Sequence, residues 1–250
     1  MVQISGLTKN FDGYTALSGL DLNINKGSIY GLVGVNGSGK TTAIKHLAGV
    51  FRPDSGHVRL DGAEVFDNAQ AKARMSYVPD DLYFFPSYNL QMLGKFYKNM
   101  YPTWDENRFA ELINLMELDP KRRVARFSKG MQKQAALTLA LSAKPEVLLL
   151  DEPIDGLDPI VRKRIFTWII DDVADRQMTV LISSHNLKEM DGICDTVGII
   201  KRGQMIMEKD LDELKAEMQA KAISEHLPPT LDEIFIYVYE NAENQEVRNG

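Results

Sequence analysis

Short apolar runs alternate with helix-like patterns along much of the chain. Runs that indicate buried strands occur at residues 29–33, 147–150 and 179–182, and apolar residues at helical spacing separate them. Strands that alternate with helices usually pair in parallel, because each helix carries the chain back to the start of the next strand. The alternation therefore predicts an α/β fold with a mostly parallel sheet.

Two parts of the chain depart from this alternation. Residues 1–30 and 56–66 indicate short strands with turn signals, which predicts an antiparallel β edge subdomain. Residues 87–127 carry apolar side chains at helical spacing, interrupted by prolines, which cannot continue a helix. We therefore expect a helical subdomain, about residues 87–140, inserted into the α/β core.

The run at 29–33 leads into a glycine-rich loop with the spacing of a P-loop. Glycines let the backbone N–H groups turn inward, and a helix starting at Lys40 adds positive potential for phosphate. The pattern predicts that Lys40 contacts the β- and γ-phosphates of a nucleotide and that Thr41 offers its hydroxyl to Mg²⁺. A simple glycine-rich turn is the alternative. The nucleotide-binding residues expected here lie in the segment Gly34-Val35-Asn36-Gly37-Ser38-Gly39-Lys40-Thr41-Thr42.

The run at 147–150 ends in two carboxylates, Asp151 and Glu152. Ligands of an open α/β sheet collect at the carboxyl ends of its strands. Asp151 is predicted to hold Mg²⁺ through water, and Glu152 is predicted to polarise the water that attacks the γ-phosphate. A salt-bridged or solvated acidic pair is the alternative, but the P-loop upstream favours the catalytic interpretation.

The composition sets outer limits on the function. The 250 residues are 44% apolar and 26% charged, which is ordinary for a soluble protein with a sizeable core. The net charge of −6 argues against a nucleic-acid partner. The start of the chain does not resemble a signal peptide, and the best membrane candidate, residues 135–143, is shorter than the about 20 residues of a span. With Cys194 as a lone, packed thiol, we expect a cytoplasmic protein.

The segment Phe127-Ser128-Lys129-Gly130-Met131-Gln132 resembles the signature of ABC ATPases. The family pattern is serine, glycine, glycine, a variable residue and glutamine. Ser128, Gly130 and Gln132 therefore match, and Lys129 departs from the pattern. Ser128 also has the position of a helix N-cap, which is a structural alternative to nucleotide binding.

Further matches to the ABC ATPases follow in family order, in Gly156-Leu157-Asp158 and in His185 after the run at 179–182. The resemblance places Asp158 among the nucleotide-binding residues and His185 at the γ-phosphate, although a lone histidine after a strand is usually structural. Phe11 occupies the position where this family stacks an aromatic ring on adenine. Core packing is the alternative for Phe11, and Tyr14 is its rival for stacking.

Asp80 stands where the family usually has glutamine, or sometimes glutamate, next to Mg²⁺ and the attacking water. An ionised carboxylate only accepts hydrogen bonds, whereas an amide both donates and accepts. Because Asp80 is also one methylene shorter, we expect it to reach Mg²⁺ through a water. A solvated turn after Pro79 is the alternative.

The resemblance covers roughly residues 1–210, and we expect residues 211–250 to form a C-terminal helical extension. It implies that two such subunits, identical or different, enclose two ATP molecules with Mg²⁺. Ser128, Gly130 and Gln132 of one subunit would then face the P-loop of the other.

The function implied by the resemblance is that of an ATP-hydrolysing motor subunit of a membrane ABC transporter, most similar to bacterial exporters. It would lie on the inner face of the membrane, with its helical subdomain and the Asp80 loop docked on a membrane-spanning subunit. Residues 229–235 are similar to the tail of exporter ATPases. The alternatives are a soluble ABC ATPase that remodels ribosomes or DNA, and a regulator that binds ATP without useful turnover.

Overall fold

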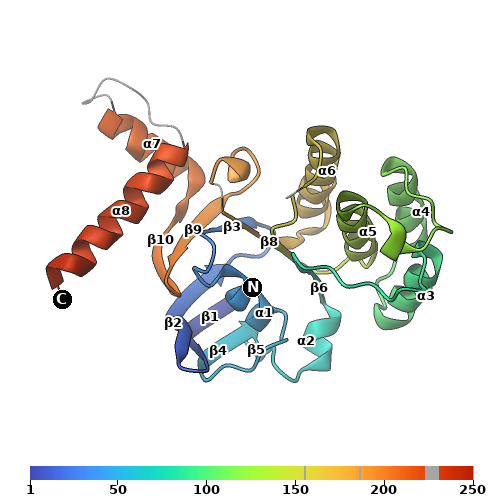
Figure 1. The fold of residues 1–250 in the computed structure, drawn as a ribbon, viewed down its shortest axis with the longest axis horizontal. Helices are drawn as coiled ribbons and strands as arrows, with labels where there is room; N and C mark the ends of the chain where they lie inside the picture. The colour runs from blue at the N-terminus through green and yellow to red at the C-terminus, as the bar shows by residue number, and fades with distance from the viewer. Residues whose placement is uncertain (155, 186, 223–230, 250) are drawn as a thin grey trace.

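The computed structural model describes residues 1–154, 156–185, 187–222 and 231–249. Within these residues the strands form two sheets, of which the smaller lies at the bottom of Figure 1. It has the strand order β2-β1-β4-β5 and is antiparallel throughout, which confirms the predicted antiparallel edge. Its strands are Val2–Phe11 (β1), Tyr14–Ile24 (β2), Ser55–Leu60 (β4) and Ala63–Glu64 (β5).

Strands β1 and β2 are longer than the sequence predicted, with 10 and 11 residues. Register shifts interrupt their pairing, and Gly6 and Gly19 have left-handed φ angles of 58° and 64°. Such irregularities break the alternation of side chains between the two faces, so one long strand resembles several short ones in the sequence. The Asp12-Gly13 turn between them has positive φ at both residues, as a type I′ hairpin requires.

The larger sheet has the strand order β10-β9-β3-β8-β7-β6. Its first edge strand, β10, pairs antiparallel with β9, and the other neighbours are parallel. Strands β3, β7 and β8 are buried along their whole length, as expected for a parallel sheet covered on both faces. The predicted α/β fold is therefore confirmed. The strands are Ile29–Val33 (β3), Met75–Val78 (β6), Val147–Asp151 (β7), Thr179–Ser184 (β8), Thr196–Lys201 (β9) and Gln204–Asp210 (β10).

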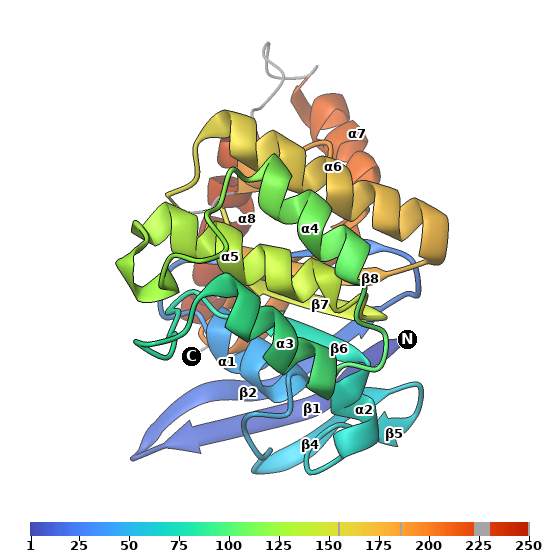
Figure 2. The same cartoon turned by 90° about the vertical axis from the view of Figure 1, so that its right-hand side faces the viewer.

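Three helices, α3, α4 and α5, lie side by side at the right of Figure 1 and face the viewer in Figure 2. They confirm the inserted helical subdomain. Asn89, Asp105 and Ser128 begin them, because each side chain accepts a hydrogen bond from the N–H three residues further on. The helices are Lys40–Leu47 (α1), Ala69–Ala73 (α2), Leu90–Met100 (α3), Glu106–Leu115 (α4), Lys129–Ser142 (α5), Pro159–Arg176 (α6), Leu211–Ala222 (α7) and Leu231–Asn249 (α8), with 3₁₀ turns at Val124–Arg126 and Leu187–Met190.

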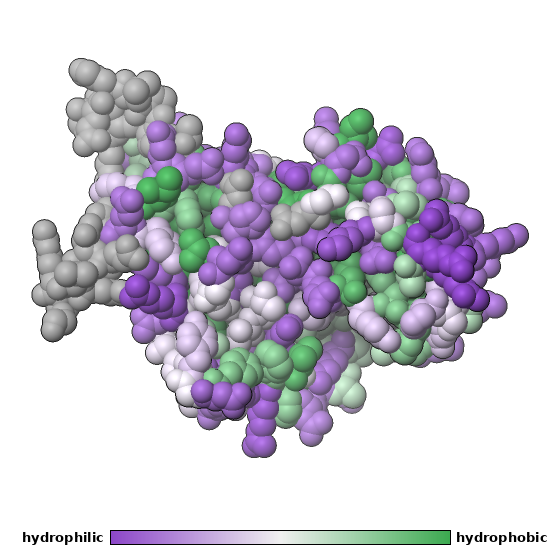
Figure 3. Space-filling model, viewed as in Figure 1, coloured by the Kyte–Doolittle hydropathy of each residue, from purple (hydrophilic) through white to green (hydrophobic). Residues whose placement is uncertain are grey.

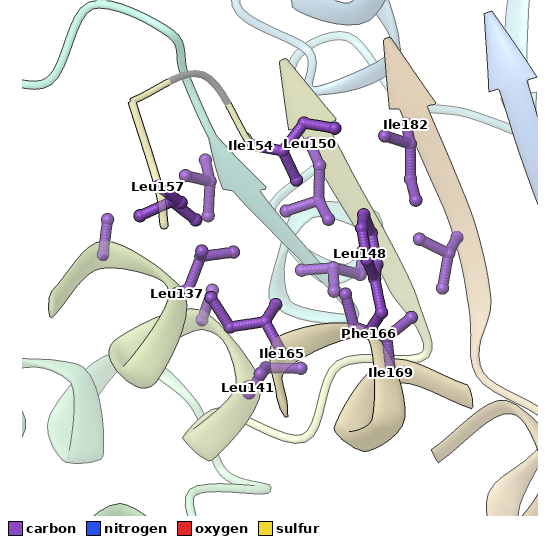
Figure 4. Close-up of a cluster of buried hydrophobic side chains, with 14 of the residues drawn as sticks. Leu137, Leu141, Leu148, Leu150, Ile154, Leu157, Ile165, Phe166, Ile169 and Ile182 are labelled. Atoms are coloured by element: carbon purple, nitrogen blue, oxygen red, sulfur yellow. The ribbon is translucent and has the colours of Figure 1, made fainter. Parts of the chain in front are cut away.

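Helices on both faces of the larger sheet hold β7 in place. Leu148 and Leu150 belong to the buried cluster formed with α5 and α6, whereas Val147 and Leu149 belong to the cluster formed with α1. This alternation fixes the register of the strand, and truncating Leu148 to alanine would cost about 2–5 kcal/mol. Side chains of the first cluster are drawn in Figure 4, with Leu137 and Leu141 from α5, Leu148 and Leu150 from β7, and Ile165, Phe166 and Ile169 from α6.

The remaining expectations concern the surface and the end of the chain. No helix of the described residues could span a membrane, and residues 135–143 are buried, almost all of them within α5. On the face shown in Figure 3, hydrophobic residues form small clusters among hydrophilic ones. Cys194 is a buried thiol, as predicted. Helices α7 and α8 lie in the predicted C-terminal extension, and residues 229 and 230 of the exporter-like segment lie outside the described residues.

Candidate functional site

The predicted site residues converge because four neighbouring parallel strands end at the same edge of the sheet. The order β3-β8-β7-β6 places the P-loop, His185, Glu152 and Asp80 next to one another, since each directly follows one of these strands or lies within two residues of its end. The sequence contains these segments in a different order, so the sheet topology brings them together.

The loop between β3 and α1 depends on its glycines. A Cβ atom on Gly34 would lie 2.5 Å from the carbonyl oxygen of Ile200, and one on Gly39 would lie 2.9 Å from that of Ala16. Gly39 also has a left-handed φ of 112°. Larger residues would therefore displace the backbone. Lys40 begins α1, as predicted, and its Nζ donates a hydrogen bond to the Gly34 carbonyl at 2.6 Å.

A cavity of about 310 Å³ lies over this loop. Glycine backbone, hydroxyl groups and the ammonium of Lys40 on one side meet two aromatic rings on the other, which suits a ligand with a phosphate end and a flat apolar end. The lining residues are Phe11, Tyr14, Ala16, Asn36, Gly37, Ser38, Gly39, Lys40, Thr41, Thr42, Asp80 and Glu152.

Asp151 has one carboxylate oxygen fixed and one free. Its Oδ1 accepts hydrogen bonds from the hydroxyls of Thr41 at 3.1 Å and Ser183 at 2.7 Å. Its Oδ2 is buried and has no partner among the described residues. Burial raises the pKa of Asp151, although the two hydroxyls act in the opposite direction. A buried oxygen with no donor next to a hydroxyl fits a small hard cation. Ser183 was not predicted from the sequence.

Glu152 is held by contacts with four residues. Its Oε1 lies 3.3 Å from Lys40 Nζ and its Oε2 lies 3.1 Å from His185 Nδ1. Its N–H donates to Ser183 Oγ at 3.0 Å, and its carbonyl accepts from Lys133 Nζ at 2.7 Å. The residue has a left-handed φ of 47°, which costs about 1–3 kcal/mol outside glycine and persists where the surroundings fix it.

Asp80 is paired with a lysine that the sequence reasoning did not assign to the site. Lys133 Nζ donates to Asp80 Oδ1 at 3.2 Å as well as to the Glu152 carbonyl. The ammonium therefore joins the loop after β6 to the end of β7. Little in the sequence indicated this role, because Lys133 lies between Gln132 and Gln134, before the apolar run of α5 that begins at Ala135.

The signature residues and Asp158 do not line the cavity. Ser128 and Asp158 are N-caps of α5 and α6, and Gln132 donates from Nε2 to the backbone of the preceding turn. A Cβ on Gly130 would lie 3.0 Å from the Gly156 carbonyl. The N-cap alternative for Ser128 is therefore confirmed as its role within one chain, and the nucleotide contacts of these four residues stay a prediction.

Phe11 and Tyr14 both border the cavity but differ in how firmly they are held. The Phe11 ring packs edge-on against Phe51, with 5.4 Å between the ring centres, and Lys9 Nζ lies 5.4 Å from its centre. Tyr14 is 60% exposed and makes a long hydrogen bond of 3.5 Å to the Gly37 carbonyl. The better-fixed ring of Phe11 suits stacking on a base.

Comparison with known proteins agrees with this geometry. Residues 17–155 match the family model described as "ABC transporter". The ABC transporter ATP-binding protein YtrB of Bacillus subtilis is 35% identical over 217 residues, which is 87% of this chain and 74% of YtrB. The daunorubicin/doxorubicin resistance ATP-binding protein DrrA of Streptomyces peucetius is 33% identical over 229 residues, covering 89% of this chain and 69% of DrrA.

A solved structure of an ATP-binding subunit of an ABC transporter has the same fold, with a TM-score of 0.84 at 22% identity over 96% of this chain and 99% of that one. The chain therefore belongs to the ABC transporter family, as the signature predicted. It is an ATP-binding and ATP-hydrolysing subunit of that family.

Proposed function

We propose that this chain drives an exporter by hydrolysing ATP in the cavity above α1. The observation that carries this proposal is the contact of Glu152 with both Lys40 and His185, at 3.3 Å and 3.1 Å, beside the phosphate loop. A base, a phosphate-binding cation and a second polar group are thereby within reach of one reacting centre. Similarity to the resistance protein DrrA supports export as the direction of transport.

The phosphates of ATP would bind the N–H groups of residues 34–39 and the first turn of α1. Lys40 would exchange its contact with Glu152 for the β- and γ-phosphates, because the phosphates carry more charge than one carboxylate. Loss of that cation leaves Glu152 free to accept a hydrogen bond from a water molecule. Phe11 would stack on the adenine at the other end of the cavity.

Thr41 and Asp151 would hold Mg²⁺, and we base this on the unpartnered buried Oδ2 of Asp151 beside the Thr41 hydroxyl. The described residues contain no cluster of three or more side chains that could hold a metal alone. Mg²⁺ at nucleotide sites is usually bound by one or two protein carboxylates together with substrate phosphates. The ion would supply positive charge to the phosphate oxygens. Asp80 lines the same cavity, but its carboxylate is paired with Lys133.

A second ATP-binding subunit would complete the site. Ser128, Gly130, Gln132 and Asp158 lie away from the cavity of their own chain, so they would reach a nucleotide only across a dimer. The net charge of −6 gives no basis for a nucleic-acid partner. A membrane-spanning subunit would bind the chain to the cytoplasmic face of the membrane.

Two measurements test this function. First, co-expression with its membrane-spanning partner subunit should bring the chain into the membrane fraction, whereas cofractionation with ribosomes or nucleic acid would favour the remodelling alternative. Second, the purified complex in inverted membrane vesicles should take up cargo when ATP is added outside. Glu152→Gln in the same complex is the control, because it removes the base and keeps the size of the side chain.

A further inference from the structure

Lys133 is a buried cation near the start of α5. It is 9% exposed, and the residues that follow in the helix, Ala135 and Leu137, are 0% exposed. Lysine is rarely buried unless its charge is paired, so this position requires compensation. The compensation comes from two oxygens, the carbonyl of Glu152 at 2.7 Å and the Oδ1 of Asp80 at 3.2 Å.

These two contacts have different characters. The carbonyl of Glu152 belongs to the backbone at the end of β7, so it stays in place whatever the side chain does. Asp80 lies on the loop after β6, and its side chain is 55% exposed. The ammonium group therefore connects the helical subdomain to a fixed point in the core and to a more exposed loop. A change in the position of α5 would act directly on the backbone of Glu152.

The identity of residue 80 agrees with this connection. A glutamine amide at this position would present both a donor and an acceptor, whereas the Asp80 carboxylate presents acceptors alone. Its natural complement is a donor with positive charge, which Lys133 supplies. The aspartate at position 80, which departs from the family pattern, is therefore the charged partner of the buried lysine in α5.

We propose that Lys133 is a positioning residue for ATP hydrolysis, held in place by Asp80. It fixes the carbonyl of Glu152 and so helps to maintain the left-handed φ of 47° that directs the carboxylate towards Lys40 and His185. This role rests on the proposed role of Glu152 as the base. Lys133 itself touches neither the phosphates nor the attacking water, since it does not line the cavity.

The first test is Lys133→Met, which keeps a long unbranched side chain, one atom shorter than that of lysine, and removes both contacts. We expect kcat to fall by about 10- to 100-fold, because the Glu152 carboxylate would be slightly displaced from its position beside the reacting groups. ATP affinity by calorimetry should stay within about threefold, because the phosphate loop is intact. Lys144→Met is the matched control, since Lys144 follows the other end of α5 and pairs with Asp105 at 3.5 Å. It should leave kcat unchanged.

The second test is a double-mutant cycle with Asp80→Asn, a change at an exposed side chain that leaves folding intact. Asp80→Asn should lower kcat less than Lys133→Met, and the double variant should be no slower than Lys133→Met, because the two residues act as one unit. Asp80→Glu, which keeps the charge, should be closer to the wild type than Asp80→Asn.

Three results would overturn the inference: a wild-type kcat for Lys133→Met, a wild-type kcat for Asp80→Asn, or losses that multiply in the double variant. If Lys133→Met does not fold, the kcat values of the Asp80 variants still test the inference. A wild-type rate for Glu152→Gln would instead show that Glu152 is not the base, which would contradict the proposed function itself.

Discussion

The two sides of the nucleotide cavity are built in different ways. On the side of β3 and β7, Lys40 bonds to its own loop and Thr41 bonds to Asp151, so residues of two motifs contact each other directly. On the side of β6 and α5, Asp80 departs from the family pattern and bonds to Lys133, which belongs to none of the motifs. Both sides meet at Glu152.

This difference separates what the backbone dictates from what side chains arrange. The phosphate loop needs glycine at Gly34 and Gly39 because a Cβ would collide with neighbouring backbone, so few sequences satisfy it. The Asp80 side imposes no such steric condition. There the contact is a pair of complementary side chains, Asp80 and Lys133, and no close approach to the backbone is involved.

The largest effect is expected at the point where the two sides meet. Glu152→Gln should slow ATP hydrolysis by about 100- to 10,000-fold, since a positioned general base is lost. ATP affinity should not fall, because Lys40 no longer has a charged carboxylate to hold it. Steady-state turnover and calorimetry measure the two quantities. ATP should also stabilise a dimer in size-exclusion chromatography, and a monomeric variant with normal turnover would exclude Glu152 as the base.

The next largest effect is expected on the side of β3 and β7, where residues of the sequence motifs contact each other directly. Lys40→Ala should weaken the affinity for ATP with Mg²⁺ by about 100-fold, because charged hydrogen bonds contribute on the order of 1.5–3 kcal/mol each. Calorimetry on the purified chain measures this. Thermal unfolding in the absence of nucleotide serves as the check on folding, and unchanged affinity in a folded variant would contradict the assignment of the phosphate loop.

The parts of the site that could be predicted are those in which local sequence fixes local backbone. The P-loop, the start of α1 at Lys40 and the two carboxylates after β7 follow from spacing along a strand, a loop and a helix. Ser183 and Lys133 could not be predicted in this way. They bond to Asp151 and Asp80 across 32 and 53 residues of sequence, and these contacts depend on β8 lying beside β7 and on α5 lying beside β6.

The fold shows the same division. The parallel core was predicted from apolar runs, because strands buried on both faces leave a continuous signal. The lengths of β1 and β2 were not predicted, since register shifts near Gly6 and Gly19 interrupt the alternation of side chains between the two faces of the sheet. Sequence patterns thus report regular geometry well and report irregular pairing poorly.

A third, smaller effect is expected on the side of β3 and β7, at the end of the cavity where the adenine would stack. Phe11→Ala should lower ATP affinity by about tenfold, because stacking on a nucleotide base typically contributes on the order of 1–3 kcal/mol. Phe66→Ala is the matched control, because Phe66 is also 38% exposed and also lies beside a lysine, Lys72, but does not line the cavity. If Tyr14→Ala has the larger effect, Tyr14 is the stacking residue.

The smallest effect is expected in a magnesium titration, and it distinguishes the two possible roles of Asp80. If Asp80 reached Mg²⁺ through a water, Asp80→Asn and Asp80→Ala would both shift the half-saturating Mg²⁺ concentration for ATPase activity upwards. The carboxylate instead has a partner in Lys133, and Thr41 with Asp151 offers the ion a buried oxygen that no donor satisfies. We therefore expect both Asp80 variants to keep the midpoint within about twofold of the wild type while kcat falls. Asp151→Asn provides the reference, because it should raise the midpoint clearly by weakening a direct charge at the ion. A midpoint that moves as far for Asp80→Asn as for Asp151→Asn would assign Asp80 to the metal and would make its contact with Lys133 secondary.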